Sequence, residues 1–148
     1  STIHAESVET VIKRLETPPI ELPPTLMNVL DCVCIMGQAI VNKQETRKVK
    51  EIVEIINVEE SGAALTNTPF MWNPKDNEFY SKRTSKIFEK IALRFGKTRE
   101  EIEKEFRQRT QLLYLLIQQK KSGFHEVQEI INEYYKNPQG VLKKFGIV

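Results

Sequence analysis

The sequence has no hydrophobic run close to the roughly 20 residues that cross a bilayer, and its N-terminus lacks a basic segment followed by an apolar one. We therefore expect neither a membrane span nor a secretory leader, and we predict a cytoplasmic protein. Its 22 basic and 20 acidic residues are mixed along the chain, with no long block of one sign. The charge therefore indicates neither a nucleic-acid partner nor an anionic membrane surface.

Cysteine and histidine are scarce, with 2 residues of each type in the chain. Cys32 and Cys34 cannot supply the four ligands of a structural zinc site, so no metal site is predicted. Residues two apart in a strand point to the same face, so we expect the two thiols to be buried together in a strand, in a reducing compartment. His125 falls near the start of an expected helix, where a surface position is predicted.

The sequence also lacks a phosphate-binding P-loop. Gly96, Lys97 and Thr98 match the end of the pattern G-x-x-x-x-G-K followed by Ser or Thr, but Ile91 stands where the first glycine belongs. A P-loop needs a strand before it and successive backbone N–H groups around the phosphate, whereas Ile91 falls within an expected helix. Gly96 and Thr98 have a local explanation instead, because glycine ends helices and threonine caps them.

The first half of the chain carries mainly strand patterns. The 148 residues, 40% hydrophobic and 28% charged, suit one globular domain or two small subdomains. Apolar spacing and turn residues predict two helices, a buried strand and two hairpins. The predicted ranges are helix 5–15, short helix 25–30, strand 31–36, hairpin strands 38–41 and 47–58 around a turn at 42–45, and hairpin strands 65–72 and 78–80.

The second half of the chain shows only helical periodicity. We predict a helix over 87–95 that Gly96 ends. A capping box made by Thr98 and Glu101 opens a long helix, and a third helix is predicted around 127–134. The long helix is expected to keep one face apolar, and that face carries Ile102, Phe106, Leu113 and Ile117.

Several stretches, taken in order, resemble the C-terminal half of archaeal secretion ATPases of the type II/type IV family, the hexameric motors behind pilus-like filaments and the archaellum. STIHAESVETVIKRL at 1–15 is similar to the second part of the family's histidine box and the helix after it, and TPPI at 17–20 is similar to the loop that follows. RKVKEIVEI at 47–55 looks like the strand that closes the motor core. FMWNP at 70–74 and EYYKNP at 133–138 look like the hairpin and final helix of the archaeal C-terminal extension.

This resemblance implies an α/β fold. Residues 1–58 would be the C-terminal portion of a RecA-like P-loop ATPase core, and residues 59–148 a β-hairpin with a mainly helical C-terminal subdomain. The intact parent would be an enzyme, a hexamer that hydrolyses ATP with Mg and couples hydrolysis to filament assembly or protein export. The implied partners are a membrane platform protein and the pilin machinery at the inner face of the cell membrane, and no nucleic acid.

The resemblance also assigns residue roles. His4 would be the histidine of the box, which senses the terminal phosphate, and Thr2 its companion in the motif. Arg14 and Arg47 match family positions and are candidate nucleotide-binding residues, with a structural salt bridge as the alternative for each. The Walker motifs would lie upstream of residue 1. The chain is therefore expected to be a fragment that neither binds nor hydrolyses ATP by itself.

Other interpretations stay open. The chain could be a stand-alone α+β interaction module without catalytic activity, whose helices after residue 80 dock a partner. A nucleic-acid binder is a further alternative that rests on Lys and Arg content alone. A fragment that lacks half of a RecA-like core is also expected to expose apolar strand edges, which self-association would cover.

Overall fold

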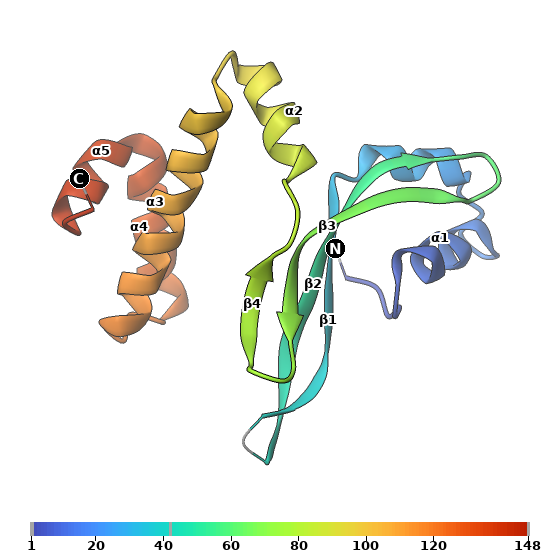
Figure 1. Ribbon diagram of the computed structural model, residues 1–148, viewed down its shortest axis with the longest axis horizontal. Coiled ribbons are helices and arrows are strands. Elements are labelled where there is room, and N and C mark those ends of the chain that lie inside the picture. Colours follow the sequence, from blue (N-terminus) through green and yellow to red (C-terminus); the bar gives the residue numbers. More distant parts are fainter. Residues whose placement is uncertain (1, 42, 148) are drawn as a thin grey trace. The chain divides into compact units, whose positions relative to one another are not determined.

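A computed structural model describes residues 2–41 and 43–147, which form an α+β fold with one four-stranded antiparallel sheet and several helices (Figure 1). The chain divides into two compact units, residues 1–90 and residues 91–148. Unit 1 holds the sheet and unit 2 is helical. The domain boundary predicted after residue 58 falls at the end of a strand inside unit 1.

Unit 1 opens with helix α1, Val8–Glu16, which confirms the first predicted helix. Ser7 caps it, because the Ser7 hydroxyl accepts a hydrogen bond from the backbone N–H of Thr10 at 3.2 Å. The helix buries an apolar face at Val8, Val11 and Ile12. Thr17 and the prolines after it end the helix, as the sequence predicts.

The sheet of unit 1 has the strand order β1-β2-β3-β4, and each strand pairs antiparallel with the next along the chain. Both predicted hairpins are confirmed. The first predicted strand and the first hairpin arm are one continuous strand, β1, and the turn position Asn42 lies outside the described residues. The strands are β1 Cys32–Val41, β2 Gln44–Val58, β3 Ala64–Asn73 and β4 Glu78–Ser81.

The core of unit 1 lies between one face of the sheet and the segment that holds α1 and the 3-10 helix η1, Pro24–Val29. The Asn28 side chain ties η1 to the end of β2, because it donates to the carbonyl of Val58 at 3.0 Å and accepts from the Val58 N–H at 2.7 Å. Burying these aliphatic side chains supplies the main driving force for folding. The buried members are Val8, Ile12, Met27, Val53, Ile55 and Val58.

Helix α2, Lys86–Phe95, leads from unit 1 into unit 2, which contains α3 Arg99–Gln118, α4 Phe124–Lys136 and α5 Pro138–Lys144. Gly96 adopts a φ of 61°, the left-handed conformation expected of a glycine that ends a helix. The predicted capping box is confirmed, since Thr98 and Glu101 exchange both hydrogen bonds. The core of unit 2 is formed by Leu112, Leu116, Ile130, Tyr134, Val141 and Leu142.

The fold is α+β because its sheet is antiparallel, and the described residues do not show the parallel sheet on which a RecA-like core is built. The prediction of buried cysteines is wrong. Cys32 and Cys34 share one face of β1 but are exposed, because the core packs against the other face of this strand, which carries Val33 and Ile35. On α3, Ile102 is buried, whereas Phe106, Leu113 and Ile117 on the same apolar face are exposed.

Within the described part of the chain, no helix combines the length and the apolar character that a bilayer crossing requires. The longest helix, α3, carries alternating charges along its exposed surface and forms ion pairs between successive turns. Examples are Arg99 with Glu103 and Arg109 with Glu105.

Candidate functional site

The residues assigned to the histidine box lie in the segment before α1. Thr2 and His4 are both exposed, and Ser1 lies outside the described residues. Neither side chain forms a hydrogen bond or ion pair with any other described residue. The imidazole of His4 is therefore open to solvent in the part of the chain that the structure describes.

The two predicted arginines occupy separate positions in unit 1. Arg14 lies in the last turn of α1, where a cation interacts favourably with the helix dipole. Arg47 lies on β2 opposite Gln38, near the turn between β1 and β2. Both are exposed, and within the described residues neither forms the predicted salt bridge. No hydrogen bond or ion pair among the described residues joins His4, Arg14 and Arg47.

A buried carboxylate, which the sequence analysis missed, organises the other side of the sheet. Glu54 on β2 is only 2% exposed. Its oxygens accept hydrogen bonds from the Asn67 side chain at 2.7 Å, from the Ser85 hydroxyl, and from the backbone N–H groups of Lys86 at 2.8 Å and Ile87 at 3.4 Å. These donors come from β3 and from the start of α2. A charged residue inside the apolar run of β2 was the signal that could have revealed this anchor.

Two opposing effects set the pKa of Glu54. Burial favours the neutral acid and raises the pKa, but the donors from Ser85, Asn67 and the α2 backbone outweigh burial and hold it below the ordinary value of 4.5. The N-terminus of α2 also favours a negative charge at this position. Every donor comes from the chain itself, so we interpret Glu54 as a structural anchor for α2 rather than as a catalytic acid.

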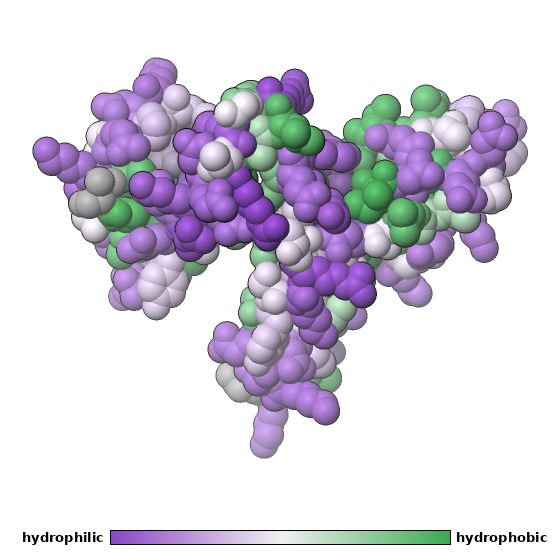
Figure 2. Space-filling view, turned by 45° about the horizontal axis from the view of Figure 1, so that its top comes forward, coloured by the Kyte–Doolittle hydropathy of each residue, from purple (hydrophilic) through white to green (hydrophobic). Residues whose placement is uncertain are grey.

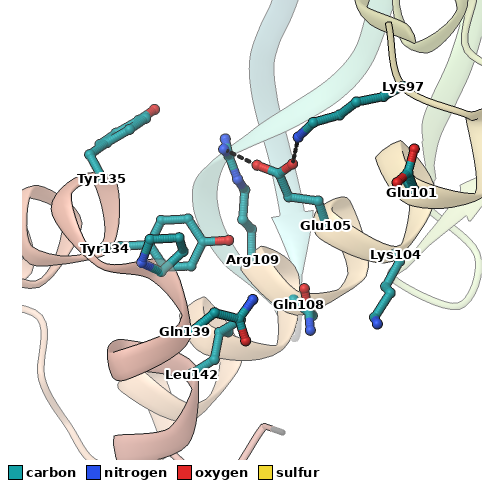
Figure 3. A pocket seen from close by; sticks show the side chains of 11 residues that line it. Lys97, Glu101, Lys104, Glu105, Gln108, Arg109, Tyr134, Tyr135, Gln139 and Leu142 are labelled. Carbon is teal, nitrogen blue, oxygen red and sulfur yellow. Dashed lines mark hydrogen bonds and ion pairs between the residues drawn. The ribbon is translucent and has the colours of Figure 1, made fainter. Parts of the chain in front are cut away.

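Unit 2 contains a hollow of about 460 Å³ between α3, the C-terminal end of α4, and α5 (Figure 3). Its wall on α3 and on the turn before it is mainly polar, and its other wall is aromatic and apolar. The polar wall is made of Lys97, Glu101, Lys104, Glu105, Gln108 and Arg109, and the other wall of Tyr134, Tyr135, Pro138, Gln139 and Leu142.

Glu105 and Arg109 are central to this hollow. Figure 3 shows the Arg109 guanidinium beside the ring of Tyr134 and directed toward Glu105. The guanidinium carbon lies 5.4 Å from the ring centre of Tyr134 and 5.7 Å from that of Tyr135. The Lys97 ammonium reaches the same carboxylate of Glu105 at 2.9 Å. The hydrogen bond from Lys97, with Arg109 beside it, holds the pKa of Glu105 below its ordinary value.

The stretch 96–98, which matches the end of the P-loop pattern, lies between α2 and α3 rather than after a strand. Gly96 and Thr98 join two helices, and the Lys97 ammonium is bound to Glu105. Among the described residues, no group of three or more His, Cys, Asp or Glu side chains is arranged to hold a metal ion.

No protein-family model matches the sequence. An uncharacterized protein of Methanocaldococcus jannaschii is 31% identical to it over 141 residues, which cover 95% of this chain and 52% of that protein. A second uncharacterized protein of the same organism is 29% identical over 141 residues, which cover 92% of this chain and 26% of that protein. The chain thus spans about half the length of the first relative and about a quarter of the second.

Proposed function

We propose that the chain is the C-terminal part of a longer archaeal motor ATPase of the secretion and pilus-assembly type. In this proposal residues 1–58 add their antiparallel strands to a RecA-like core whose parallel strands lie in the rest of the polypeptide. Residues 59–148 form the C-terminal extension, and ATP and Mg bind to the rest of the polypeptide. The parent works as a cytoplasmic hexamer that drives a membrane platform protein and the pilin machinery. Both relatives support a longer parent, since each extends well beyond the matched region.

The observation that carries this proposal is the free edge of β1. Among the described residues, β2 is the one strand that pairs with β1, and from Cys32 to Val41 β1 contains neither a charged residue nor a proline. Proteins usually protect an edge strand with charged residues or proline, because an unprotected edge pairs with other strands. Met36 and Ile40 add exposed apolar surface, at 59% and 75%. An edge of this kind is expected where further strands of a larger sheet continue.

The surface around α1 supports the same proposal. Figure 2 shows hydrophobic side chains gathered at the end of unit 1 that carries α1 and η1. Ile20, Leu26 and Val29 are 47%, 45% and 78% exposed in this region. Apolar patches of this kind commonly mark surfaces that another domain or subunit covers.

In the proposed parent, His4 donates a hydrogen bond that is present with ATP and absent with ADP, and Thr2 supports it. The exposed imidazole of His4 is compatible with this role because no described residue forms a hydrogen bond or an ion pair with it. Arg14 and Arg47 are retained as candidate nucleotide-binding residues, since both guanidinium groups are exposed and outside any described ion pair.

The test uses the full-length protein encoded by the gene. Its reading frame is expected to contain G-x-x-x-x-G-K followed by Ser or Thr upstream of Ser1, and the purified protein is expected to hydrolyse ATP. His4→Ala should lower the ATPase rate about tenfold or more, as the loss of one preorganised donor does. His125→Ala is the matched control, because His125 is an exposed residue of α4, and it should leave the rate unchanged. A full-length protein without the P-loop pattern, or equal rates for His4→Ala and wild type, would contradict the proposal.

A stand-alone interaction module is the second candidate, and the exposed apolar stripe on α3 favours it. Leu113 and Ile117 are 51% and 71% exposed, with Phe106 at 42% on the same side of the helix. Such a stripe fits the docking of a partner helix. A reading frame that begins with methionine immediately before Ser1 would support the module and exclude the motor.

A further inference from the structure

We propose that the hollow in unit 2 is a binding site for the carboxylate side chain of an acidic peptide segment. The residues that form it lie between Lys97 and Leu142, all within unit 2. The inference therefore stands independently of the proposed motor function. Its volume of about 460 Å³ is in the range of ordinary ligand sites, roughly 300–1,000 Å³.

The hollow has more hydrogen-bond donors to offer than acceptors. Three cations line it, Lys97, Lys104 and Arg109, against two carboxylates. Both carboxylates are already engaged: Glu101 accepts from the Thr98 N–H at 2.7 Å, and Glu105 accepts from Lys97 and Arg109. An ionised carboxylate can accept hydrogen bonds but not donate them, whereas ammonium and guanidinium groups can only donate. The donors that remain can therefore bind an acceptor from another molecule.

Lys104 is the most accessible of these donors. It is exposed at the rim of the hollow, and it forms neither a hydrogen bond nor an ion pair with any described residue. The side-chain amides of Gln108 and Gln139 face the same space and likewise have no partner among the described residues. An incoming carboxylate would accept from Lys104 and from these amides without breaking any contact within unit 2.

The aromatic wall favours a peptide over a small inorganic ion. Leu142 and Tyr134, at 1% and 7% exposure, form a rigid floor, while Tyr135 stands 70% exposed at the mouth. Tyr135 lies close to the Arg109 guanidinium and presents a flat amphipathic ring beside the donors. A free ion uses only the donors. An acidic side chain with an adjacent aliphatic residue uses both the donors and the ring, so an acidic and aliphatic peptide is the better match.

The experiment measures binding of a fluorescein-labelled peptide rich in glutamate and leucine to the complete chain. A peptide with glutamine in place of each glutamate serves as the reference ligand. We expect the acidic peptide to bind at least about fivefold more tightly than the amide peptide, and the difference to shrink at high salt because exposed charges are screened. Amide shifts in a two-dimensional NMR spectrum should concentrate at Lys104, Gln108 and Gln139.

Two variants and one matched control locate the site. Lys104→Gln removes the accessible donor and Tyr135→Leu removes the exposed ring, and neither residue is buried. Each should weaken the acidic peptide about threefold or more. Lys143→Gln makes the same charge change on α5 outside the hollow, and it should have no effect. An unchanged far-UV circular dichroism spectrum would show that each variant is folded.

Three results would overturn the proposal. The first is equal affinity for the acidic and amide peptides. The second is an equal loss of binding in Lys104→Gln and Lys143→Gln, which would indicate attraction by net charge alone. The third is that inorganic phosphate shifts the same amides while the acidic peptide shifts none, which would make the hollow a phosphate site instead.

Discussion

Glu54 in unit 1 and Glu105 in unit 2 are both carboxylates held by several donors, but their surroundings are opposite. Glu54 is buried, and all its donors are neutral groups from β3 and α2. Glu105 has a side chain that is 31% exposed, and its donors are the two cations Lys97 and Arg109. The first carboxylate joins elements of the fold, whereas the second arranges charges around an open hollow.

The difference in burial determines how much each carboxylate contributes to stability. A buried carboxylate that loses its charge leaves several desolvated donors without a strong acceptor, and that costs a great deal of stability. An exposed ion pair is screened by water and salt, so it contributes little.

Trp72, the one tryptophan of the sequence, is 8% exposed on β3 and reports on unit 1, while far-UV circular dichroism reports mainly on the helices.

The largest expected effect separates the two units. Leu142→Ala removes a side chain that is 1% exposed in the core of unit 2, and it should lower the free energy of unfolding of that unit by about 3 kcal/mol. The helical signal should therefore unfold at lower urea, while the Trp72 fluorescence transition stays in place. Leu113→Ala replaces an exposed residue of α3, so it is the control and should change the unfolding free energy little. Equal shifts of both signals would show that the units unfold together.

The next effect tests the buried carboxylate. Glu54→Gln should destabilise unit 1 by about 2 kcal/mol, because the new amide N–H₂ faces backbone donors at the start of α2. Urea unfolding followed by Trp72 fluorescence measures this change. Glu45→Gln on the exposed end of β2 is the matched control, with an expected change below about 0.5 kcal/mol. If the two variants are equally stable, Glu54 does not anchor α2.

Acid should remove the same contribution without a mutation. The pKa of Glu54 is lower in the folded state than the ordinary value of 4.5, so its stabilisation is complete above that value and is lost as the pH falls through the folded pKa. The difference in unfolding free energy between wild type and Glu54→Gln should therefore be constant from pH 7 to about pH 5 and shrink at lower pH. A difference that grows on acidification would contradict this assignment.

The smallest expected effect comes from the exposed carboxylate. Glu105→Gln should destabilise unit 2 by no more than about 0.5 kcal/mol, because the pairs with Lys97 and Arg109 are open to solvent. Thermal unfolding followed by circular dichroism at low and high salt measures it, and salt should remove most of the difference. A loss as large as that of Glu54→Gln would mean that exposure does not distinguish the two carboxylates.

Local structure was largely predictable from the sequence. The capping box of Thr98 and Glu101, the glycine stop at Gly96 and both hairpins follow from short-range chemistry, and the structure has all of them. Helix and turn signals need only a few neighbouring residues, so they can be read from a single chain. The roles of His4, Thr2, Arg14 and Arg47 come from resemblance alone and remain predictions.

Burial and side-chain partnership were decided by tertiary structure. Cys32 and Cys34 look like core residues in the sequence, but they lie on the face of β1 that points away from the core, so they are exposed. Glu54 reads as a surface residue until β3 and α2 supply its donors. The hollow around Arg109 exists only because α4 brings two tyrosines to α3. By itself the sequence determined where helices, turns and strands form, since those depend on local contacts. Which faces are buried depends on contacts between distant segments, and only the folded chain settled that.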